Sequence, residues 1–426
     1  ERECVTLAVE KAKAEGYKDI RDVIKNGGEV KAGDKLYAVC MNKTIALFHM
    51  GTKSLTEGMN ILGAHIDSPR IDVKQNPLYE NEEFAYLDTH YYGGIKKYQW
   101  VTLPLALHGV IVKTDGTVQK VNIGEKEDDP VFVVTDLLIH LAGKQMEKKA
   151  STVIEGEKLD LLIGSRPLEK EEGLDEDEKD AVKANVMKIL TDYYNMEEED
   201  FLSAELEIVP AGKARDCGLD RSMVLAYGQD DRVCAYTALT AEIDTKKPEH
   251  TTVTILTDKE ETGSDGNTGL NSDYVLHYIE DLASMEKVAV RDVLKASLCL
   301  SSDVNAAYDP TFADVYEARN SSYINKGCVL TKYTGARGKS GSNDASAETM
   351  AKVIGIMEDA GVYWQAGELG AVDAGGGGTI AKFVAHMDVD TVDLGVPILS
   401  MHAPFELSSK LDVYHTYKAF KAFYAS

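Results

Sequence analysis

The chain has 426 residues, of which 44% are hydrophobic and 27% charged, so it is long enough for two or three domains with a sizeable core. Its 71 acidic residues outnumber its 46 Lys and Arg, and the formal charge of -25 argues against a nucleic acid or an anionic membrane surface as a partner. The six cysteines form no CxxC pair and no apolar run is long enough to predict a transmembrane helix, so we expect a cytoplasmic protein with reduced core thiols.

The first expected elements are a helix over residues 1–16 and a β-hairpin formed by residues 36–40 and 44–49. Residue 1 is Glu and not Met, which leaves room for an upstream segment. A buried strand should follow over residues 60–65 and end before Pro69, because proline has no N–H to donate to a central ladder. At its end, the spacing of His65 and Asp67 places both side chains on one face of an extended chain, where the carboxylate can orient the imidazole.

Beyond Gly94 the pattern becomes mainly β. Residues 101–112 and 118–123 predict a hairpin, and Leu206 and Ile208 alternate with glutamates as in a half-exposed strand. A charge-dense segment over residues 166–180 predicts a solvated loop or a helix lead-in, followed by a helix over residues 181–196. We therefore expect an inserted β-rich domain over residues 94–226 that interrupts an α/β domain formed by residues 1–93 and 227–426.

From residue 227 the α/β pattern resumes, and polar residues follow each apolar run. Asp230 opens a helix, where an N-cap alone would explain it. The apolar runs over residues 252–256 and 296–302 lead to Glu260-Glu261 and to Asp303, and residues 391–401 lead to His402. Residues 410–424 predict a closing amphipathic helix with one core face.

Glu260 and Glu261 are adjacent carboxylates at the point where a buried strand opens into a glycine-rich turn. In a cleft the two charges would repel each other unless a cation lies between them or one of them acts as a base. A solvated turn is the simpler interpretation of an isolated Glu-Glu pair. The repetition of His and carboxylates at the ends of several core elements favours a metal site instead.

The candidate ligands are nitrogen and oxygen donors, a set that suits zinc, cobalt or manganese. Because cysteine is absent from the set, a structural zinc site is disfavoured. Five ligands exceed what one catalytic zinc needs, but they suit two ions about 3.5–4 Å apart that share a carboxylate. The remaining acid is then free to act as the base.

Six segments together resemble one family. They are residues 63–70 (GAHIDSPR), 92–94 (YGG), 229–232 (QDDR), 258–264 (DKEETGS), 302–305 (SDVN) and 400–404 (SMHAP). In this order, and spanning nearly the whole chain, they are similar to the aspartyl aminopeptidase family of dinuclear zinc exopeptidases. The resemblance implies an α/β/α metallopeptidase domain with an inserted, mainly β dimerisation domain, and a homo-dodecamer built from dimers.

The resemblance also implies roles for single residues. His65, Asp230 and Asp303 would hold one ion, and Asp230 would bridge to a second ion held by Glu261 and His402. It further implies that Glu260 is the general base and that the peptide bond between Asp230 and Asp231 is cis.

The expected reaction is removal of the amino-terminal residue from short peptides. A water between two divalent ions loses a proton to Glu260, the resulting metal-bridging hydroxide attacks the first peptide carbonyl, and Glu260 returns the proton to the leaving amine. Asp67 should hold the far nitrogen of His65.

Expectations for substrate binding rest on weaker signals. Lys326 resembles a family position near the specificity pocket and would suit an amino-terminal Asp or Glu. His140 is the single histidine in a run where eukaryotic members carry a histidine-rich stretch that reaches a neighbouring active site. Gly377 and Gly378 could present N–H groups to a substrate carboxylate, or form only a tight turn.

Two other classes of function stay open at this point. A related dinuclear deacylase or carboxypeptidase would need an arginine for a substrate carboxylate, and Arg70 or Arg319 could supply it. A catalytically inactive, self-assembling shell protein could keep the metal site. The presence of Glu260 argues against the inactive shell.

Overall fold

The computed structural model describes residues 1–169 and 180–426, which form two compact units. The first unit comprises Glu1–Ser68, Arg215–Met401 and Glu406–Ser426, and the second comprises Pro69–Ala214 and His402–Phe405. Both boundaries differ from the expected insertion at residues 94–226. Residues 69–93 join the second unit because their two strands pair with its other strands, whereas residues 223–226 pair with a strand of the first unit.

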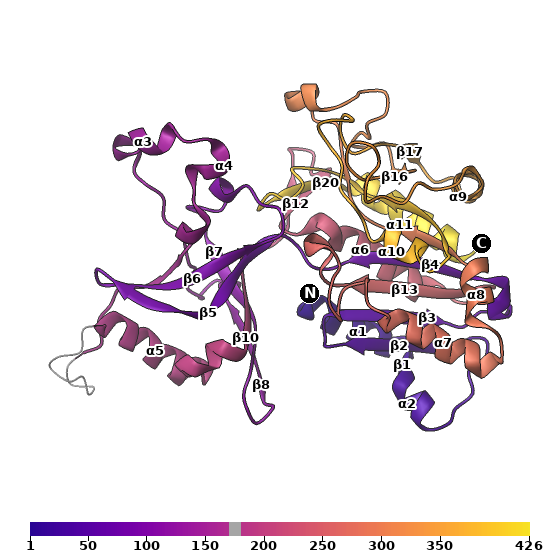
Figure 1. The fold of residues 1–426 in the computed structure, drawn as a ribbon, viewed down its shortest axis with the longest axis horizontal. Coiled ribbons are helices and arrows are strands. Elements are labelled where there is room, and N and C mark those ends of the chain that lie inside the picture. The colour runs from indigo at the N-terminus through magenta and orange to yellow at the C-terminus, as the bar shows by residue number, and fades with distance from the viewer. Residues whose placement is uncertain (170–179) are drawn as a thin grey trace. The chain divides into compact units, whose positions relative to one another are not determined.

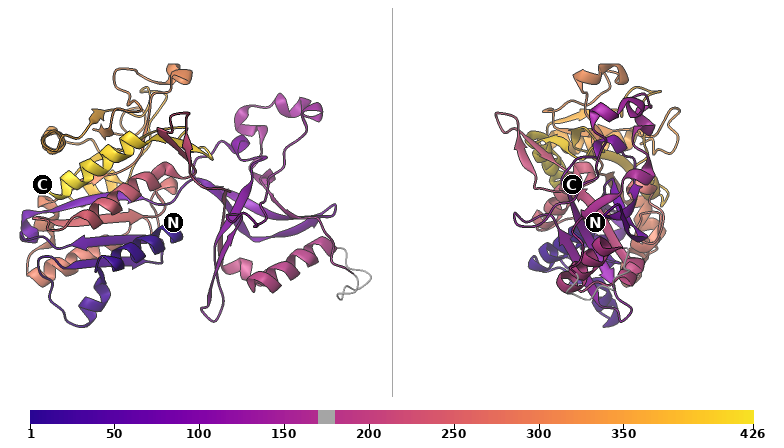
Figure 2. Two further views of the ribbon diagram at one scale, coloured as in Figure 1. Left: turned by 180° about the vertical axis from the view of Figure 1, so that it is seen from behind. Right: turned by 90° about the vertical axis from the view of Figure 1, so that its left-hand side faces the viewer.

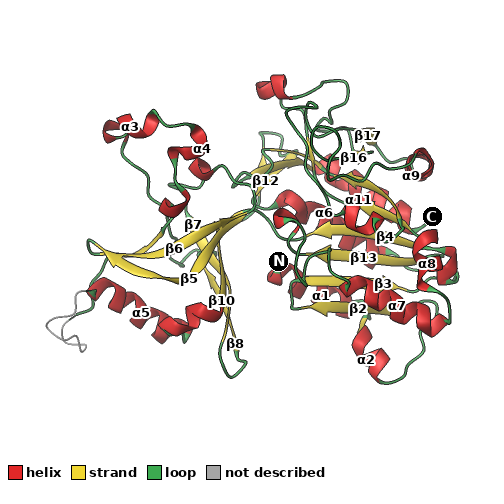
Figure 3. Ribbon diagram, in the orientation of Figure 1, coloured by secondary structure: helices red, strands yellow, loops and turns green. Residues whose placement is uncertain are grey.

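The first unit is built on a nine-stranded sheet (Figures 1 and 3). Across the sheet the strands are β1 (Lys18–Asp19), β2 (Lys35–Cys40), β3 (Thr44–His49), β13 (Thr251–Thr257), β4 (Met59–His65), β14 (Leu298–Ser301), β18 (Asp390–Gly395), β16 (Cys328–Thr331) and β17 (Trp364–Ala366). Strands β13, β4, β14 and β18 are mutually parallel, so all four end at the same edge of the sheet. This is the edge where open α/β sheets bind ligands.

Helices cover both faces of this sheet, which gives the expected α/β/α layering. The helices are α1 (Arg2–Ala14), α2 (Ile20–Lys25), α6 (Gln229–Asp244), α7 (Tyr274–Glu286), α8 (Val290–Ala296), α9 (Ala347–Asp359), α10 (Ala381–Ala385) and α11 (Lys410–Tyr424). Neighbouring residues of β4 belong to the cores on opposite faces. Ile61 lies in the core that includes residues of α2, α7, α8 and α10, and Leu62 in the core that includes residues of α6, α9 and α11. Figure 2 shows α1, α6 and α11 on the face opposite α7. Strand β4 is therefore buried on both sides, which explains its continuous apolar sequence.

A smaller sheet completes the first unit. Its strands, in order, are β11 (Arg215–Cys217), β12 (Met223–Ala226), β20 (Glu406–Ser409), β19 (Pro397–Leu399) and β15 (Asn305–Ala306). Strand β12 lies just before α6 in the sequence, β15 just after Asp303, and β20 just before α11. All six cysteines are free thiols, but only Cys234, Cys299 and Cys328 are buried, so the expectation of core thiols holds for half of them.

The second unit contains a six-stranded antiparallel sheet. Its strands, in order, are β8 (Val118–Ile123), β7 (Leu105–Val112), β10 (Ala204–Pro210), β5 (Arg70–Asn81), β6 (Phe84–Tyr92) and β9 (Leu161–Gly164). Its helices are α3 (Gly143–Met146), α4 (Ala150–Val153) and α5 (Ala181–Tyr194). The predicted hairpin is β7–β8, and most of the charge-dense segment lies outside the described residues. None of the described helices combines the length and apolarity needed to cross a membrane.

Candidate metal centre and catalytic site

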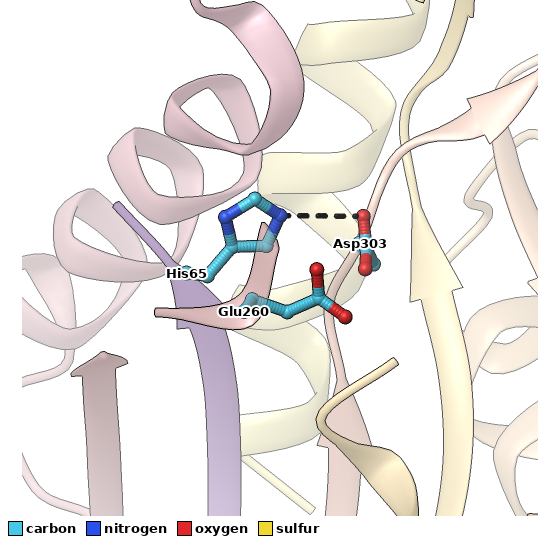
Figure 4. Close-up of side chains that lie close together, drawn as sticks. All are labelled: His65, Glu260 and Asp303. Atoms are coloured by element: carbon cyan, nitrogen blue, oxygen red, sulfur yellow. Dashed lines mark ion pairs between the residues drawn. The ribbon is translucent and has the colours of Figure 1, made fainter. Parts of the chain in front are cut away.

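His65 is the last residue of β4, and its imidazole lies at the edge where the parallel strands end. The side chain is 1% exposed. Its Nε2 atom lies 3.2 Å from Oδ1 of Asp230, at the start of α6, and 3.8 Å from Oδ1 of Asp303, which follows β14. Figure 4 shows the imidazole of His65 and the carboxylates of Glu260 and Asp303 facing the same space.

The adjacent glutamates follow β13 in a short 3-10 turn over Glu260–Thr262. Ligand atoms of His65, Glu260 and Asp303 lie within 4.8 Å of one another, and the same holds for His65, Asp230 and Glu261. Five of the predicted site residues therefore converge, although they come from four separate stretches of the sequence. Each of the two glutamates joins a different group of three.

Asp67 connects the imidazole to the glutamate turn. Its carboxylate accepts the backbone N–H of Glu260 and that of Glu261, each at 3.2 Å. Nδ1 of His65 lies 3.3 Å from Oδ1 of the same carboxylate and 3.1 Å from the Asp67 carbonyl oxygen. One fully buried carboxylate thus orients both the ring and the backbone that carries the two acids.

The backbone around Asp230 is held from two sides, and the peptide bond from Asp230 to Asp231 is cis. The hydroxyl of Ser68 donates to the Asp230 carbonyl at 2.6 Å, and the Asp230 N–H donates to Oε2 of Glu406 at 3.0 Å. Sequence analysis assigned no role to Ser68 or Glu406. Ser68 lies inside a quoted motif and could have been noticed, whereas nothing in the sequence marks Glu406, an acid at the start of a strand.

The buried ionisable groups of the site shift one another's pKa values strongly. Burial lowers the pKa of His65, but hydrogen bonds to Asp230 and Asp67 outweigh it, so the pKa lies well above its ordinary value. Burial, and then repulsion from Asp231 and other acids, raises the pKa of Asp303 well above its usual range. Cations among these groups would remove the repulsion, and a set of imidazole and carboxylate donors suits zinc.

A glycine at the end of β18 allows Asp303 to take its position. A Cβ atom at Gly395 would lie 1.8 Å from the carbonyl oxygen of Asp303. The backbone leaving β14 therefore packs directly on Gly395, and any side chain there would displace it.

Two predicted site residues belong to the second unit. His402 has Nδ1 at 2.8 Å from the carbonyl oxygen of Gly94, so this nitrogen donates its proton and the lone pair of the neutral ring is on Nε2. That tautomer suits a metal ligand, but the assignment of His402 stays a prediction. His140 lies in an exposed 3-10 turn, Ile139–Leu141, and its role in substrate binding also stays a prediction.

The remaining predicted substrate-binding residues lie in loops of the first unit. Lys326 is exposed and precedes β16. The carbonyl of Gly377 accepts the N–H of Gly335 at 2.5 Å, so the glycine-rich segment packs on another loop. Helix α10 begins at Ala381, beyond both Gly377 and Gly378, and the role of these glycines in substrate binding stays a prediction.

Comparison with known proteins identifies the family. The model of the family described as aminopeptidase I zinc metalloprotease (M18) matches residues 1–424. The chain belongs to the M18 family. Among curated relatives, a probable M18 family aminopeptidase 1 from Clostridium acetobutylicum is 55% identical over 99% of this chain and 91% of its own. The corresponding protein from Thermotoga maritima is 46% identical over 97% and 92%.

Solved structures support the same fold. The crystal structure of aminopeptidase I from Clostridium acetobutylicum matches this M18 chain with a TM-score of 0.94 at 53% identity, covering 100% of this chain and 92% of that one. A structure described as the S. cerevisiae mApe1 dodecamer matches with a TM-score of 0.78 at 20% identity, over 98% and 92%, which shows the fold alone. The expected metallopeptidase fold with a β-rich insertion is thus confirmed.

Membership of the M18 family also decides the class of activity. This M18 protein is a zinc metallo-aminopeptidase, a hydrolase that acts on peptide bonds. The alternatives of a deacylase or carboxypeptidase and of an inactive shell are thereby disfavoured.

Proposed function

We propose that this aminopeptidase removes amino-terminal residues from short peptides at the cluster around His65, with two zinc ions and Glu260 as the general base. His65, Asp230 and Asp303 would hold one ion, and Asp230, Glu261 and His402 the other. The observation that carries the proposal is the double convergence on one buried imidazole, in which Glu260 and Glu261 belong to different groups. When bound, the ions would polarise the scissile carbonyl and acidify the attacking water.

Glu260 handles the proton in this reaction. Its carboxylate accepts a proton from the water as the water oxygen bonds to the peptide carbon, and donates it to the amine nitrogen as the carbon–nitrogen bond breaks. Asp67 holds the Glu260 N–H and thereby keeps the carboxylate beside His65 and Asp303. The other oxygen of the same carboxylate accepts the N–H of the adjacent Glu261 and fixes that residue as well.

Zinc content and turnover of two matched variants test this division of roles. Glu260→Gln should keep both ions and lower kcat by roughly 10²- to 10⁴-fold, because it removes a proton acceptor. Glu261→Gln should lower zinc content from two ions toward one per chain. Equal loss of zinc in both variants, or full turnover in Glu260→Gln, would contradict the assignment.

A preference for amino-terminal Asp or Glu is the second part of the proposal, with Lys326 as the cation that selects the acidic side chain. Its loop enters β16 at the edge where β4 and β14 end, because β16 runs antiparallel to β18. The overall charge of -25 works against acidic peptides by slowing their approach. The test compares kcat/KM for Glu and Leu amides, and the Glu-to-Leu ratio should fall in Lys326→Ala.

We also propose that the β-rich insertion builds a homo-oligomer, a dodecamer assembled from dimers. The yeast dodecamer of the same fold supports this arrangement. The six free thiols fit a reducing compartment such as the cytoplasm. Light scattering of the full chain, and of a chain in which residues 69–214 are replaced by a short linker, tests the assembly. The shortened chain should form particles with fewer copies of the chain.

A further inference from the structure

The segment Tyr323 to Gly327 carries Lys326 to the same sheet edge as the candidate metal centre. Val329 of β16 is in register with Gly395, and Gly395 touches the backbone of Asp303. The three residues from Lys326 to Val329 span at most about 11 Å. The backbone of Lys326 therefore lies within reach of the strand end that carries Asp303, and the conformation of this segment decides where the ammonium group points.

Asp412 fixes this conformation from the first turn of α11. Its carboxylate accepts the N–H of Asn325 through Oδ2 and the N–H of Gly327 through Oδ1, each at 2.7 Å. Asp412 is completely buried, so water does not compete for these bonds. Ser409, the N-cap of α11, donates through its hydroxyl to the side-chain oxygen of Asn325 at 2.5 Å. The residues on both sides of Lys326 are thus held by one helix terminus.

Gln365 of β17 holds the same segment from its other side. Its amide nitrogen donates to the carbonyls of Tyr323, at 2.8 Å, and Gly327, at 3.2 Å, and its oxygen accepts the Tyr323 N–H at 2.8 Å. Gly327 has φ 91, and a Cβ atom there would lie 1.9 Å from the Tyr363 carbonyl oxygen. The backbone N–H of Lys326 also bonds to Asp412, but within the described part of the chain its ammonium group makes no hydrogen bond or ion pair, so the side chain is left available.

We propose that Asp412 is a positioning residue for substrate selection, which holds the backbone on both sides of Lys326 so that the ammonium group meets the amino-terminal side chain of the peptide. This inference rests on the proposed role of Lys326. The rigid segment supplies a cation whose placement costs little conformational entropy on binding, since its backbone is already ordered. Asp412 contacts the backbone of the segment and has no contact with substrate.

The test is a double-mutant cycle with Asp412→Asn and Lys326→Ala in the zinc-loaded full chain. Asn keeps the shape but turns an N–H₂ group toward one of the two backbone N–H groups, which breaks that bond. We expect the Glu-to-Leu ratio of kcat/KM to fall roughly tenfold in Asp412→Asn, as when a hydrogen bond to a charged group is lost. Hydrolysis of the Leu amide should change little, and in the Lys326→Ala background Asp412→Asn should have no further effect on the ratio.

Hydrogen exchange provides a readout independent of activity, and Tyr417→Phe provides the control. Asp412→Asn should speed amide exchange in a peptide over residues 323–328. The Tyr417 hydroxyl, also on α11, donates instead to Asp244 of α6 at 2.6 Å, so its removal should alter neither the exchange nor the ratio.

Three results would overturn the inference: equal losses for Glu and Leu amides in Asp412→Asn, an additive effect in the Lys326→Ala background, or unchanged exchange over residues 323–328. An unchanged ratio in Lys326→Ala would reject the proposed role of Lys326 and this inference together. A ratio lowered by Lys326→Ala but not by Asp412→Asn would reject the positioning role alone.

Discussion

The carboxylates of the candidate site have different roles, which depend on the groups that each one contacts. Glu260 and Glu261 lie in one turn and share the N–H acceptor Asp67, yet each faces a different group of ligand atoms. Asp67 is buried and directs its oxygens to hydrogen-bond donors and to the Nδ1 side of His65. We therefore expect Asp67 to act through His65 and the two glutamates.

Replacing Asp67 with Asn should weaken zinc binding by about 10- to 100-fold, as is usual for groups that orient metal ligands. The amide N–H₂ group would face a backbone N–H of the glutamate turn and push it away. Competition with a chromogenic chelator measures the affinity. Asp265→Asn is the matched control, because Asp265 lies in the same loop and its carboxylate accepts a hydrogen bond from the side chain of Asn271. A comparable loss there would point to a general effect of charge.

At the scale of elements, the site depends on how closely the strand ends pack. Strands β4, β13 and β14 deliver His65, the glutamate turn and Asp303 to one edge. The neighbouring β18 ends in Gly395, where the Asp303 backbone leaves no space for a side chain. The position of Asp303 is thus decided by a residue of another strand.

Gly395→Ala should therefore displace Asp303 and lower both zinc content and activity, with a loss of stability of about 1–3 kcal/mol from overpacking. Metal analysis and thermal unfolding measure the two effects. Gly355→Ala is the control: this glycine lies in α9 with open space around its Cβ position, so the change should stabilise by about 0.4–1 kcal/mol. Full zinc occupancy in Gly395→Ala would show that the strand end can relax.

A second inter-element contact joins α6, which carries Asp230, to the sheet through Glu242. This carboxyl is fully buried and accepts hydrogen bonds from the hydroxyls of Tyr17 at 2.8 Å, Thr252 at 3.0 Å and Thr254 at 3.2 Å. Burial, only partly opposed by these bonds, raises the pKa of Glu242 from 4.5 to about 7. In the folded protein the carboxyl therefore holds a proton over a pH range in which the unfolded chain has lost it.

Because the folded state binds this extra proton, the free energy of unfolding should fall as pH rises from 4.5 to about 7. The full decline attributable to Glu242 is about 3 kcal/mol, from 1.36 kcal/mol per pKa unit. Glu242→Gln cannot ionise and should remove this decline. Urea unfolding at a series of pH values gives the comparison, and an identical slope in wild type and variant would exclude Glu242 as its source.

In the molecule as a whole, the second unit exposes a run of large aliphatic side chains to solvent. Leu137, Leu138, Ile139 and Leu141 are 49%, 55%, 66% and 70% exposed. Contiguous exposed aliphatic side chains commonly mark an interaction surface. In the proposed oligomer this run is covered by another copy of the chain.

Ile139→Asp should therefore reduce the particle mass, because a charge cannot be buried in an apolar contact without a partner. Light scattering at several protein concentrations measures the mass. His140→Asn is the matched control within the same run, since it adds no charge to the apolar surface, and it should leave the mass unchanged. Particles of equal mass in wild type and Ile139→Asp would place the subunit contacts elsewhere.

The amino-acid sequence was sufficient to predict the family, an α/β fold with an inserted β region, and a short set of candidate ligands. Continuous apolar runs such as the one before His65 predict buried strands from the local sequence. The motifs combine residue types that only a few kinds of chemistry use together. Short local patterns were enough for the hairpins and for α11, because turn chemistry and amphipathic spacing involve neighbours in the chain.

The distant residues that support those candidate ligands are visible only in the folded chain. Glu406 reaches the backbone of Asp230 across 176 positions and Asp412 reaches Gly327 across 85, and local sequence patterns do not encode such pairs. The boundary between the units also could not be predicted locally, because the sheet that residues 70–81 and 84–92 join depends on pairing with β10, far along the chain. Several residues or strands look equivalent in sequence as partners for a long-range hydrogen bond or strand pair. Close packing in the folded chain determines which of them pair.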